Sequence, residues 1–186
     1  MARPTDDLKS EHRGIERMLR TGEKAADRLS AGKDVSPQVF LDMVDFLRNF
    51  ADKCHHGKEE KELFPAMERM GIPRQGGPLG VMLLEHEQGR AFIRSMAENA
   101  AQFAQGDASV PPQLAAAVRG YVELLRGHIY KEDHILFPMA DSVLPADEQT
   151  RLGKAFEDIE ANVMGPGVHE RYHAMLDELE KQATAW

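Results

Sequence analysis

Apolar residues recur at helical spacing along four long stretches of the chain, and each stretch is bounded by residues that start or stop helices. The segment 71–78 is rich in Gly and Pro and predicts a loop. Four long helices joined by short loops predict an all-α, up-down-up-down four-helix bundle over residues 1–144. The predicted helices run from a Thr5 cap to near Gly32, from Ser36-Pro37 to Phe64-Pro65 with a further turn ending at Gly71, from Leu79 to Gln105, and from Pro111-Pro112 to Phe137-Pro138.

Two shorter amphipathic segments follow Pro145, at about 146–163 and 168–183, separated by Gly165-Pro166-Gly167. They predict two extra C-terminal helices. We expect residues 145–186 to form an extension packed on the same domain. These two helices would cover one side of the bundle or pair with a second copy of the chain in a homodimer.

Composition narrows the class of protein. Helix-forming residues dominate while aromatic and β-branched residues are sparse, so we expect no sheet. The formal charge of −8 argues against nucleic acid and anionic membranes as partners, because both would repel an acidic surface. No apolar run approaches the roughly 20 residues of a membrane span, and the opening MARPTDDLKSEHRG lacks the apolar stretch of a signal peptide. We therefore expect a soluble, cytoplasmic protein.

The chain contains one cysteine, Cys54, which excludes an internal disulfide and any site built from four cysteines. A metal would have to rely on His, Asp and Glu. A single buried cysteine is usually a packing residue, and we interpret Cys54 in that way rather than as a redox-sensitive thiol.

The most informative feature is an internal sequence repeat, which we call the echo. The sequence HHGKEEKELFP at 55–65 repeats as HIYKEDHILFP at 128–138, and both contain HxxKE followed by LFP. Counting back from LFP aligns His55 with His128 and Glu59 with Glu132. Residues four apart lie one turn above each other on a helix, so each pair directs an imidazole and a carboxylate at one point. Two such pairs predict a dinuclear site for iron, manganese or zinc.

The doublet His55-His56 is assigned from the echo and from helical phase. At about 100° per residue, His55 continues the apolar stripe of its helix and His56 points nearly opposite. The same count selects Glu132 over Asp133 and places His134 on the surface. His55 and Glu132 are therefore the preferred ligands.

Two further histidines fall on the apolar stripes of the first and third predicted helices. Either one alone would more often be a hydrogen-bonded core residue than a ligand. Together with the echoed pairs, they would bury polar groups without partners unless a metal satisfies them. The candidate metal ligands are His12, His55, Glu59, His86, His128 and Glu132.

Four motifs over about residues 8–140, EHRGIERML, HHGKEEKELFP, EHEQGRAF and HIYKEDHILFP, resemble those of the hemerythrin-like, HHE cation-binding family. The resemblance implies an antiparallel four-helix bundle that holds two non-haem iron ions. It implies that His12 and His55 serve one iron and that His86 and His128 serve the other. Glu59 and Glu132 would bridge them.

One position departs from the oxygen-carrying members of that family, which have another ligand histidine one turn after the position of His86. Here the residue is Arg90. Arginine cannot donate a lone pair to iron, so we expect it to pair with an acid or to lie near a bound anion. The second iron would then have an open coordination position. Candidates for a replacement ligand are Glu16, Tyr121 and Glu123, and the sequence does not choose among them.

The C-terminal segment has its own histidine pair, His169 and His173, and Glu170 with His173 forms an ExxH motif. Ferritin-like di-iron sites use two such motifs together with further glutamates. Because this ExxH stands alone, we interpret the segment as a surface or lid helix.

The leading functional hypothesis is a di-iron protein that binds or senses dioxygen, nitric oxide or peroxide, or stores iron. The open position implied by Arg90 motivates it. The alternatives are a di-iron redox enzyme acting on peroxide, nitric oxide or ferrous iron, and a protein that delivers iron or repairs iron–sulfur clusters. Zinc or manganese would fit the same ligands.

Overall fold

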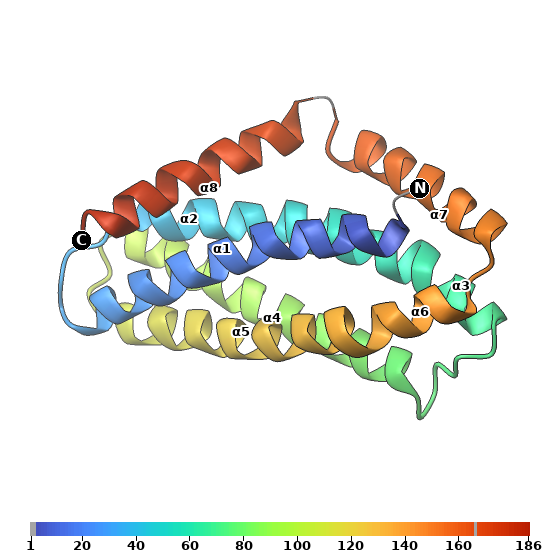
Figure 1. Cartoon of the computed structure of the whole chain (residues 1–186). Coiled ribbons are helices and arrows are strands. Elements are labelled where there is room, and N and C mark those ends of the chain that lie inside the picture. Colours follow the sequence, from blue (N-terminus) through green and yellow to red (C-terminus); the bar gives the residue numbers. More distant parts are fainter. Residues whose placement is uncertain (1–2, 166) are drawn as a thin grey trace.

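The computed structural model describes residues 3–165 and 167–186, and these residues form helices without any strand. The predicted all-α four-helix bundle is confirmed (Figure 1). Its second helix is continuous from α2 through α3, and its fourth from α5 through α6. The elements are α1 (Pro4–Ser30), α2 (Pro37–Phe46), η1 (Leu47–His56), η2 (Glu59–Leu63), α3 (Phe64–Arg69), α4 (Pro78–Ala104), α5 (Pro111–Lys131), η3 (Glu132–Leu136), α6 (Phe137–Val143), α7 (Ala146–Val163) and α8 (Val168–Thr184), where η marks π-helical segments.

The helix boundaries follow the predicted start signals with one exception. Ser36 caps α2, since its hydroxyl accepts a hydrogen bond from the Gln38 amide, with Pro37 at the first helical position. Thr5, predicted as the cap of α1, lies inside the helix, so that prediction was wrong. Pro4 takes the first helical position, and the Thr5 hydroxyl donates instead to Asp141 at 2.7 Å.

The four bundle helices contact one another in a ring, α1 against α2 and α5, and α4 against α2 and α5. Their apolar core is divided into two clusters. Along α1, Leu8 belongs to one cluster and Ile15 to the other, and along α4 the same holds for Met82 and Ile93. Between the clusters, the same helices carry buried polar residues, His12 on α1 and His86 on α4.

The C-terminal extension packs on this bundle. Tyr172 and Leu176 of α8 join the cluster that contains Ile15, while Leu152 and Phe156 of α7 join the other. The two helices meet above α1 and α2 (Figure 1). Of the predicted separator, Gly165 and Gly167 have φ of 78° and 75°, which favours glycine, and Pro166 lies outside the described residues.

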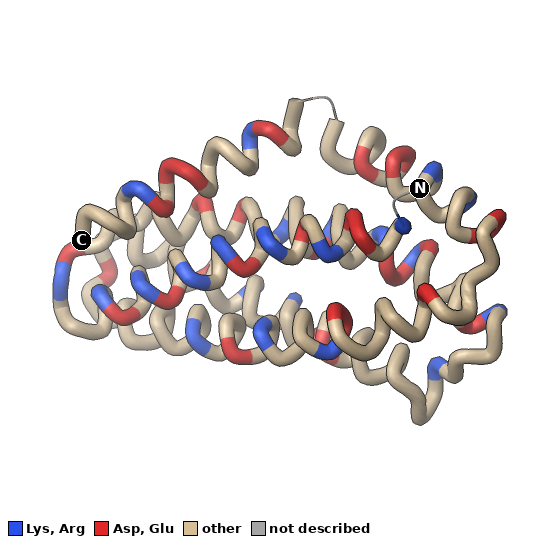
Figure 2. The backbone as a smooth tube through the Cα atoms, in the orientation of Figure 1, with Lys and Arg blue, Asp and Glu red and all other residues tan. Residues whose placement is uncertain are grey.

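Lys and Arg positions are interspersed with Asp and Glu positions along the helices (Figure 2). Within the described part of the chain, no helix combines the length and the apolar character that a bilayer span requires.

Candidate metal centre

The six predicted ligand side chains converge between the two apolar clusters. Each is at most 1% exposed, although each is polar or charged. Every helix of the bundle supplies at least one of them. They are His12 of α1, His55 of η1, Glu59 of η2, His86 of α4, His128 of α5 and Glu132 of η3.

Together with His56, these six side chains form two groups, and within each group the donor atoms lie within 4.8 Å of one another. We call these groups the first and the second donor set. The first set consists of His12, His55, Glu59 and Glu132, and the second consists of His56, Glu59, His86 and His128. Their nitrogen and carboxylate donors suit iron, manganese or zinc.

The two glutamates connect the sets. One oxygen of Glu59 lies 3.6 Å from His55 Nε2 and the other lies 3.5 Å from His86 Nε2. Glu132 Oε2 lies 3.2 Å from His12 Nε2 and 3.3 Å from His128 Nε2. Donors that bind one ion at about 2.1 Å lie roughly 3 Å apart, so these spacings are close to those of a ligand shell. Each carboxylate therefore faces one histidine of the first set and one of the second.

His56 was expected to point away from the core, and this expectation was wrong. Its side chain is 2% exposed and stacks on His86, with ring centroids 3.9 Å apart and an interplanar angle of 15°. The cause is local, because η1 is π-helical and the rotation of 100° per residue used for the prediction applies only to an α-helix. Both His55 and His56 therefore face the interior. Helical phase could not indicate the inward position of His56, because it assumes the α-helical rotation.

Arg90 pairs with acids, as expected, and does not enter either donor set. Its guanidinium donates to Asp52 at 2.8 Å and to Glu60 and Glu87 at 2.6 Å. The second set contains the imidazole of His56, and Arg90 lies outside it.

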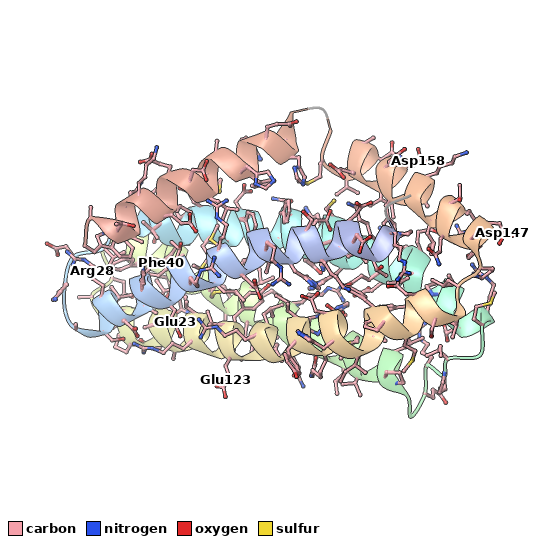
Figure 3. The ribbon with its side chains drawn as sticks, in the orientation of Figure 1. Glu23, Arg28, Phe40, Glu123, Asp147 and Asp158 are labelled. Atoms are coloured by element: carbon pink, nitrogen blue, oxygen red, sulfur yellow. The ribbon has the colours of Figure 1, made fainter. Side chains whose placement is uncertain are left out.

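None of the three candidate replacement ligands is placed in a donor set. Glu16 forms an ion pair with Arg13 at 3.0 Å, and Glu123 is exposed and points out of the bundle (Figure 3). Tyr121 is buried, and its hydroxyl has no hydrogen-bond partner among the described residues.

Other predicted placements are confirmed. His134 is exposed, as expected for a surface residue. Cys54 is buried, and burial raises the pKa of its thiol to about 12, which keeps it protonated and unreactive.

An outer layer of carboxylates holds the histidines. In four of them Nδ1 faces a carboxylate oxygen at 2.6 to 2.9 Å, and in His56 the distance to Asp52 is 3.5 Å. A carboxylate on Nδ1 makes this nitrogen the donor and leaves the Nε2 lone pair free for a metal. The four shorter pairs are His12–Asp133, His55–Glu11, His86–Glu60 and His128–Glu85.

A cation lies behind each of these carboxylates. Lys58 pairs with Glu11, and Lys131 pairs with Glu85. These are the two lysines of the HxxKE echo, so the motif supplies both an imidazole and the counter-ion of the acid that orients it. The other two pairs are Arg13 with Asp133 and Arg90 with Glu60.

The inner atoms of the site are left without partners, which tests whether the residues fit a metal. Both oxygens of Glu59 and Glu132, the Nε2 atoms of His12 and His55, and both ring nitrogens of His56 find no hydrogen bond among the described residues. Each unsatisfied buried polar group costs about 1–3 kcal/mol. Their convergence inside a ring of satisfied groups is what a metal site requires, so the residues fit.

In the metal-free site the pKa values of the histidines are shifted in two directions. Burial lowers the pKa of His55, His56 and His86, which keeps these imidazoles neutral. Burial also opposes the charge on His12, but the hydrogen bond to Asp133 and the negative charge of Glu132 outweigh it and raise its pKa to about 9.

The pKa values of the two glutamates are also shifted in opposite directions. Burial, reinforced by the charge of Glu132, raises the pKa of Glu59 well above its usual value. For Glu132 burial is outweighed by His128 and His12, and its pKa is lowered. In the metal-free site a proton therefore binds to Glu59 in preference to Glu132.

The family described as "Hemerythrin HHE cation binding domain" matches residues 3–140 of the chain. The chain is 24% identical over 176 residues to the uncharacterized protein Rv1995 of Mycobacterium tuberculosis, which covers 95% of this chain and 68% of that protein. It is 30% identical over 117 residues to the iron-sulfur cluster repair protein YtfE of Edwardsiella ictaluri, which covers 61% of this chain and 52% of that protein. No solved structure matches the chain.

Proposed function

The chain belongs to the hemerythrin HHE cation-binding family, and from this premise we propose that its two donor sets hold a pair of non-haem iron ions. The convergence of unpartnered nitrogen and carboxylate donors between the two apolar clusters carries the proposal. In this assignment His12 and His55 hold the first ion, while His56, His86 and His128 hold the second. Glu59 and Glu132 bridge the two.

The two sets differ in the number of donors that they offer. Counting the shared glutamates, the first set presents two imidazoles and two carboxylates, while the second presents three imidazoles and two carboxylates. The ion of the first set thus has fewer protein ligands and more room for an added one. This replaces the expectation, drawn from Arg90, that the second ion is the more open.

The bound iron pair would supply redox chemistry and a position for a small ligand, for which we propose dioxygen, nitric oxide or peroxide. The protein's part is to keep that position dry and rigid. His12 and His55 are at most 1% exposed, and their Nδ1 atoms are held by Asp133 and Glu11. Orientation of this kind raises the basicity of the ligating nitrogen.

The experiment is to measure metal content and the optical spectrum of tag-free protein, as isolated and after anaerobic reconstitution with ferrous iron. We expect about two irons per chain, as in di-iron carboxylate bundles, and a spectrum that changes on addition of nitric oxide or peroxide. Zinc or manganese in their place would overturn the choice of iron, and absence of any bound metal after reconstitution would overturn the site.

A second candidate function is the delivery of iron to damaged clusters, which the likeness to a protein named as an iron-sulfur cluster repair protein favours. It requires that iron leave the site. Transfer of iron from the loaded chain to a cluster-free acceptor protein, faster than from a low-molecular-weight iron chelate, would support this function over ligand binding.

A further inference from the structure

The two lysines of the echo differ in their surroundings, although each pairs with an acid that orients a ligand histidine. The side chain of Lys58 is 2% exposed, whereas that of Lys131 is 35% exposed. Among the described residues, Lys131 pairs with Glu85 alone, while Lys58 pairs with two carboxylates, those of Glu11 and Glu160. One half of the outer layer of the metal centre therefore has a cover and an added negative charge.

The cover is α7, the first helix of the C-terminal extension. It contacts α1, η1 and η2, and Figure 1 shows it above the N-terminal part of α1. Phe156 and Glu160 lie one turn apart on α7, and both reach Lys58. The Lys58 ammonium lies 5.9 Å from the centre of the Phe156 ring, and its Nζ lies 3.2 Å from Glu160 Oε2. Phe156 is buried in the apolar cluster that contains Leu8, which fixes α7 over the lysine.

These contacts join the extension to a metal ligand without a break. Glu160 binds Lys58, and Lys58 in turn binds Oε1 of Glu11. The other oxygen of Glu11 faces His55 Nδ1 at 2.8 Å, and His55 belongs to the first donor set. Three of these four side chains are at most 8% exposed, and Glu160 is 39% exposed. The line of contacts thus begins at the surface of α7 and ends at a donor to the first ion.

The negative charge of Glu160 determines its effect along this line. Without that charge, the Lys58 ammonium would be compensated by Glu11 alone, and Glu11 would accept more weakly from the Nδ1–H of His55. With it, two carboxylates share one ammonium, so Glu11 keeps more of its negative charge for the imidazole. A stronger acceptor at Nδ1 makes Nε2 a more basic ligand for a metal.

The effect should be largest for the first ion. His55 is one of two imidazoles in the first donor set, while the second set has three. Ion pairs that are open to solvent contribute little, but Lys58 and Glu11 are buried, so solvent screens the charge of Glu160 at its own end of the line only. We therefore expect the second ion to be less affected.

We propose that Glu160 is a positioning residue of the first metal ion. Through Lys58 and Glu11 it strengthens the hydrogen bond that orients His55, which makes the C-terminal extension a functional part of the metal centre. The orientation of His55 is a property of the metal-free chain, and its effect on the bound ion rests on the proposed function.

The first test is NMR of the histidine side chains in the metal-free full chain, with the His55 signals assigned from a His55→Gln variant. Glu160→Gln keeps the size of the side chain and removes its charge. It should weaken the hydrogen bond of His55 Nδ1–H and shift the signal of this proton upfield. The control is Glu157→Gln, which removes the same charge from an exposed position of α7 without an ion pair to Lys58, and it should behave as the parent.

A double-mutant cycle tests the route of the effect. Lys58→Met removes the ammonium and keeps an unbranched side chain. If Glu160 acts through Lys58, Glu160→Gln should cause no further shift of the His55 signal in the Lys58→Met background.

The second test is competition against a chelator in the iron-loaded full chain. Loss of a direct hydrogen-bond partner of a ligand weakens metal binding by about 10- to 100-fold. Glu160 is two contacts further out than such a partner, so Glu160→Gln should weaken the first ion by less than about 10-fold. The Mössbauer spectrum of the same variant should change for one of the two irons, and Glu157→Gln should match the parent in both measurements.

The outcomes separate the positioning role from the identity of the metal. A shifted His55 signal in Glu160→Gln, in a chain that binds no iron, would support the positioning of His55 and overturn the di-iron function. An unchanged His55 signal in Glu160→Gln, an equal shift in Glu157→Gln, or a shift that persists in full in the Lys58→Met background would overturn the positioning role. A shifted signal with unchanged iron affinity and Mössbauer spectrum would overturn the effect on the bound ion.

Discussion

Replacement of His56 by alanine is the sharpest test of the metal centre, because helical phase in an α-helix would place this residue outside it. The structure has its imidazole in the second donor set, 2% exposed and stacked on His86 at 3.9 Å. The change removes one of three imidazoles from this set and leaves the first set intact. We expect selective loss of the second ion.

The magnitude follows from the ligand count. Loss of a hydrogen-bond partner to a ligand weakens metal binding by about 10- to 100-fold. Loss of the ligand itself should weaken metal binding at least about 100-fold, or by about 2.8 kcal/mol at 1.4 kcal/mol per tenfold change. The metal-free chain should still fold. The substitution leaves a cavity, which is destabilising, but it also removes two buried nitrogens that lack hydrogen-bond partners, and this offsets part of the loss in stability.

The assay is iron content after anaerobic reconstitution, with affinity measured by competition against a chelator and folding by circular dichroism. His134→Ala serves as the matched control, because this histidine is exposed and belongs to the same echo. Full iron content and unchanged affinity in His56→Ala, together with iron loss in His55→Ala, would refute the reasoning and restore the assignment made from helical phase.

Three other predictions concern the layers around the donors. Arg90→Ala, which frees the Glu60 carboxylate that holds His86, should weaken metal binding by about 10- to 100-fold in the same chelator competition, and an unchanged affinity would show that the outer layer does not orient the ligand. The stability that protonated His12 gives the metal-free chain is fully present below pH 6.5 and is lost as the pH rises through about 9, so urea unfolding should show a fall over this window in the parent and a smaller one in His12→Gln. Tyr121→Phe removes a buried hydroxyl that has no partner among the described residues and should stabilise the metal-free chain by about 1–3 kcal/mol in urea unfolding, whereas a loss of stability would mean that the hydroxyl is satisfied.

Most of the fold could be predicted from the sequence because its signals are local. Proline and serine at helix starts, glycine in the loops and apolar periodicity place the helices to within a few residues of their observed bounds. The error at Thr5 was of two residues, because the N-cap is Arg3, Pro4 takes the first helical position and the Thr5 hydroxyl binds Asp141. Competition of this kind between local and tertiary partners is invisible in a single sequence.

The convergence of the predicted ligands could also be predicted from the sequence, because four apolar stripes that meet in a bundle bring the polar residues on them together. The inward position of His56 was not. It depends on a π-helical register in η1, and η2 and η3 repeat this geometry at Glu59–Leu63 and Glu132–Leu136. A helical wheel assumes one constant rotation per residue, so it fails where the backbone hydrogen bonds shift from i−4 to i−5. Such shifts are concentrated at functional sites, and all three here lie at or beside the donor residues.

The lysines of the echo gain a physical meaning only in three dimensions. Lys131 belongs to the same motif as His128 but pairs with Glu85 of α4, the acid that faces His128 Nδ1. Burial alone would raise the pKa of Glu85, and His128 together with Lys131 outweighs it and lowers that pKa. An ionised Glu85 can only accept, so Nδ1 must donate and Nε2 keeps the lone pair that a metal needs. Lys58 stands in the same relation to Glu11 and His55, and each half of the echo thereby sets the tautomer of its own ligand through an acid borrowed from a neighbouring helix.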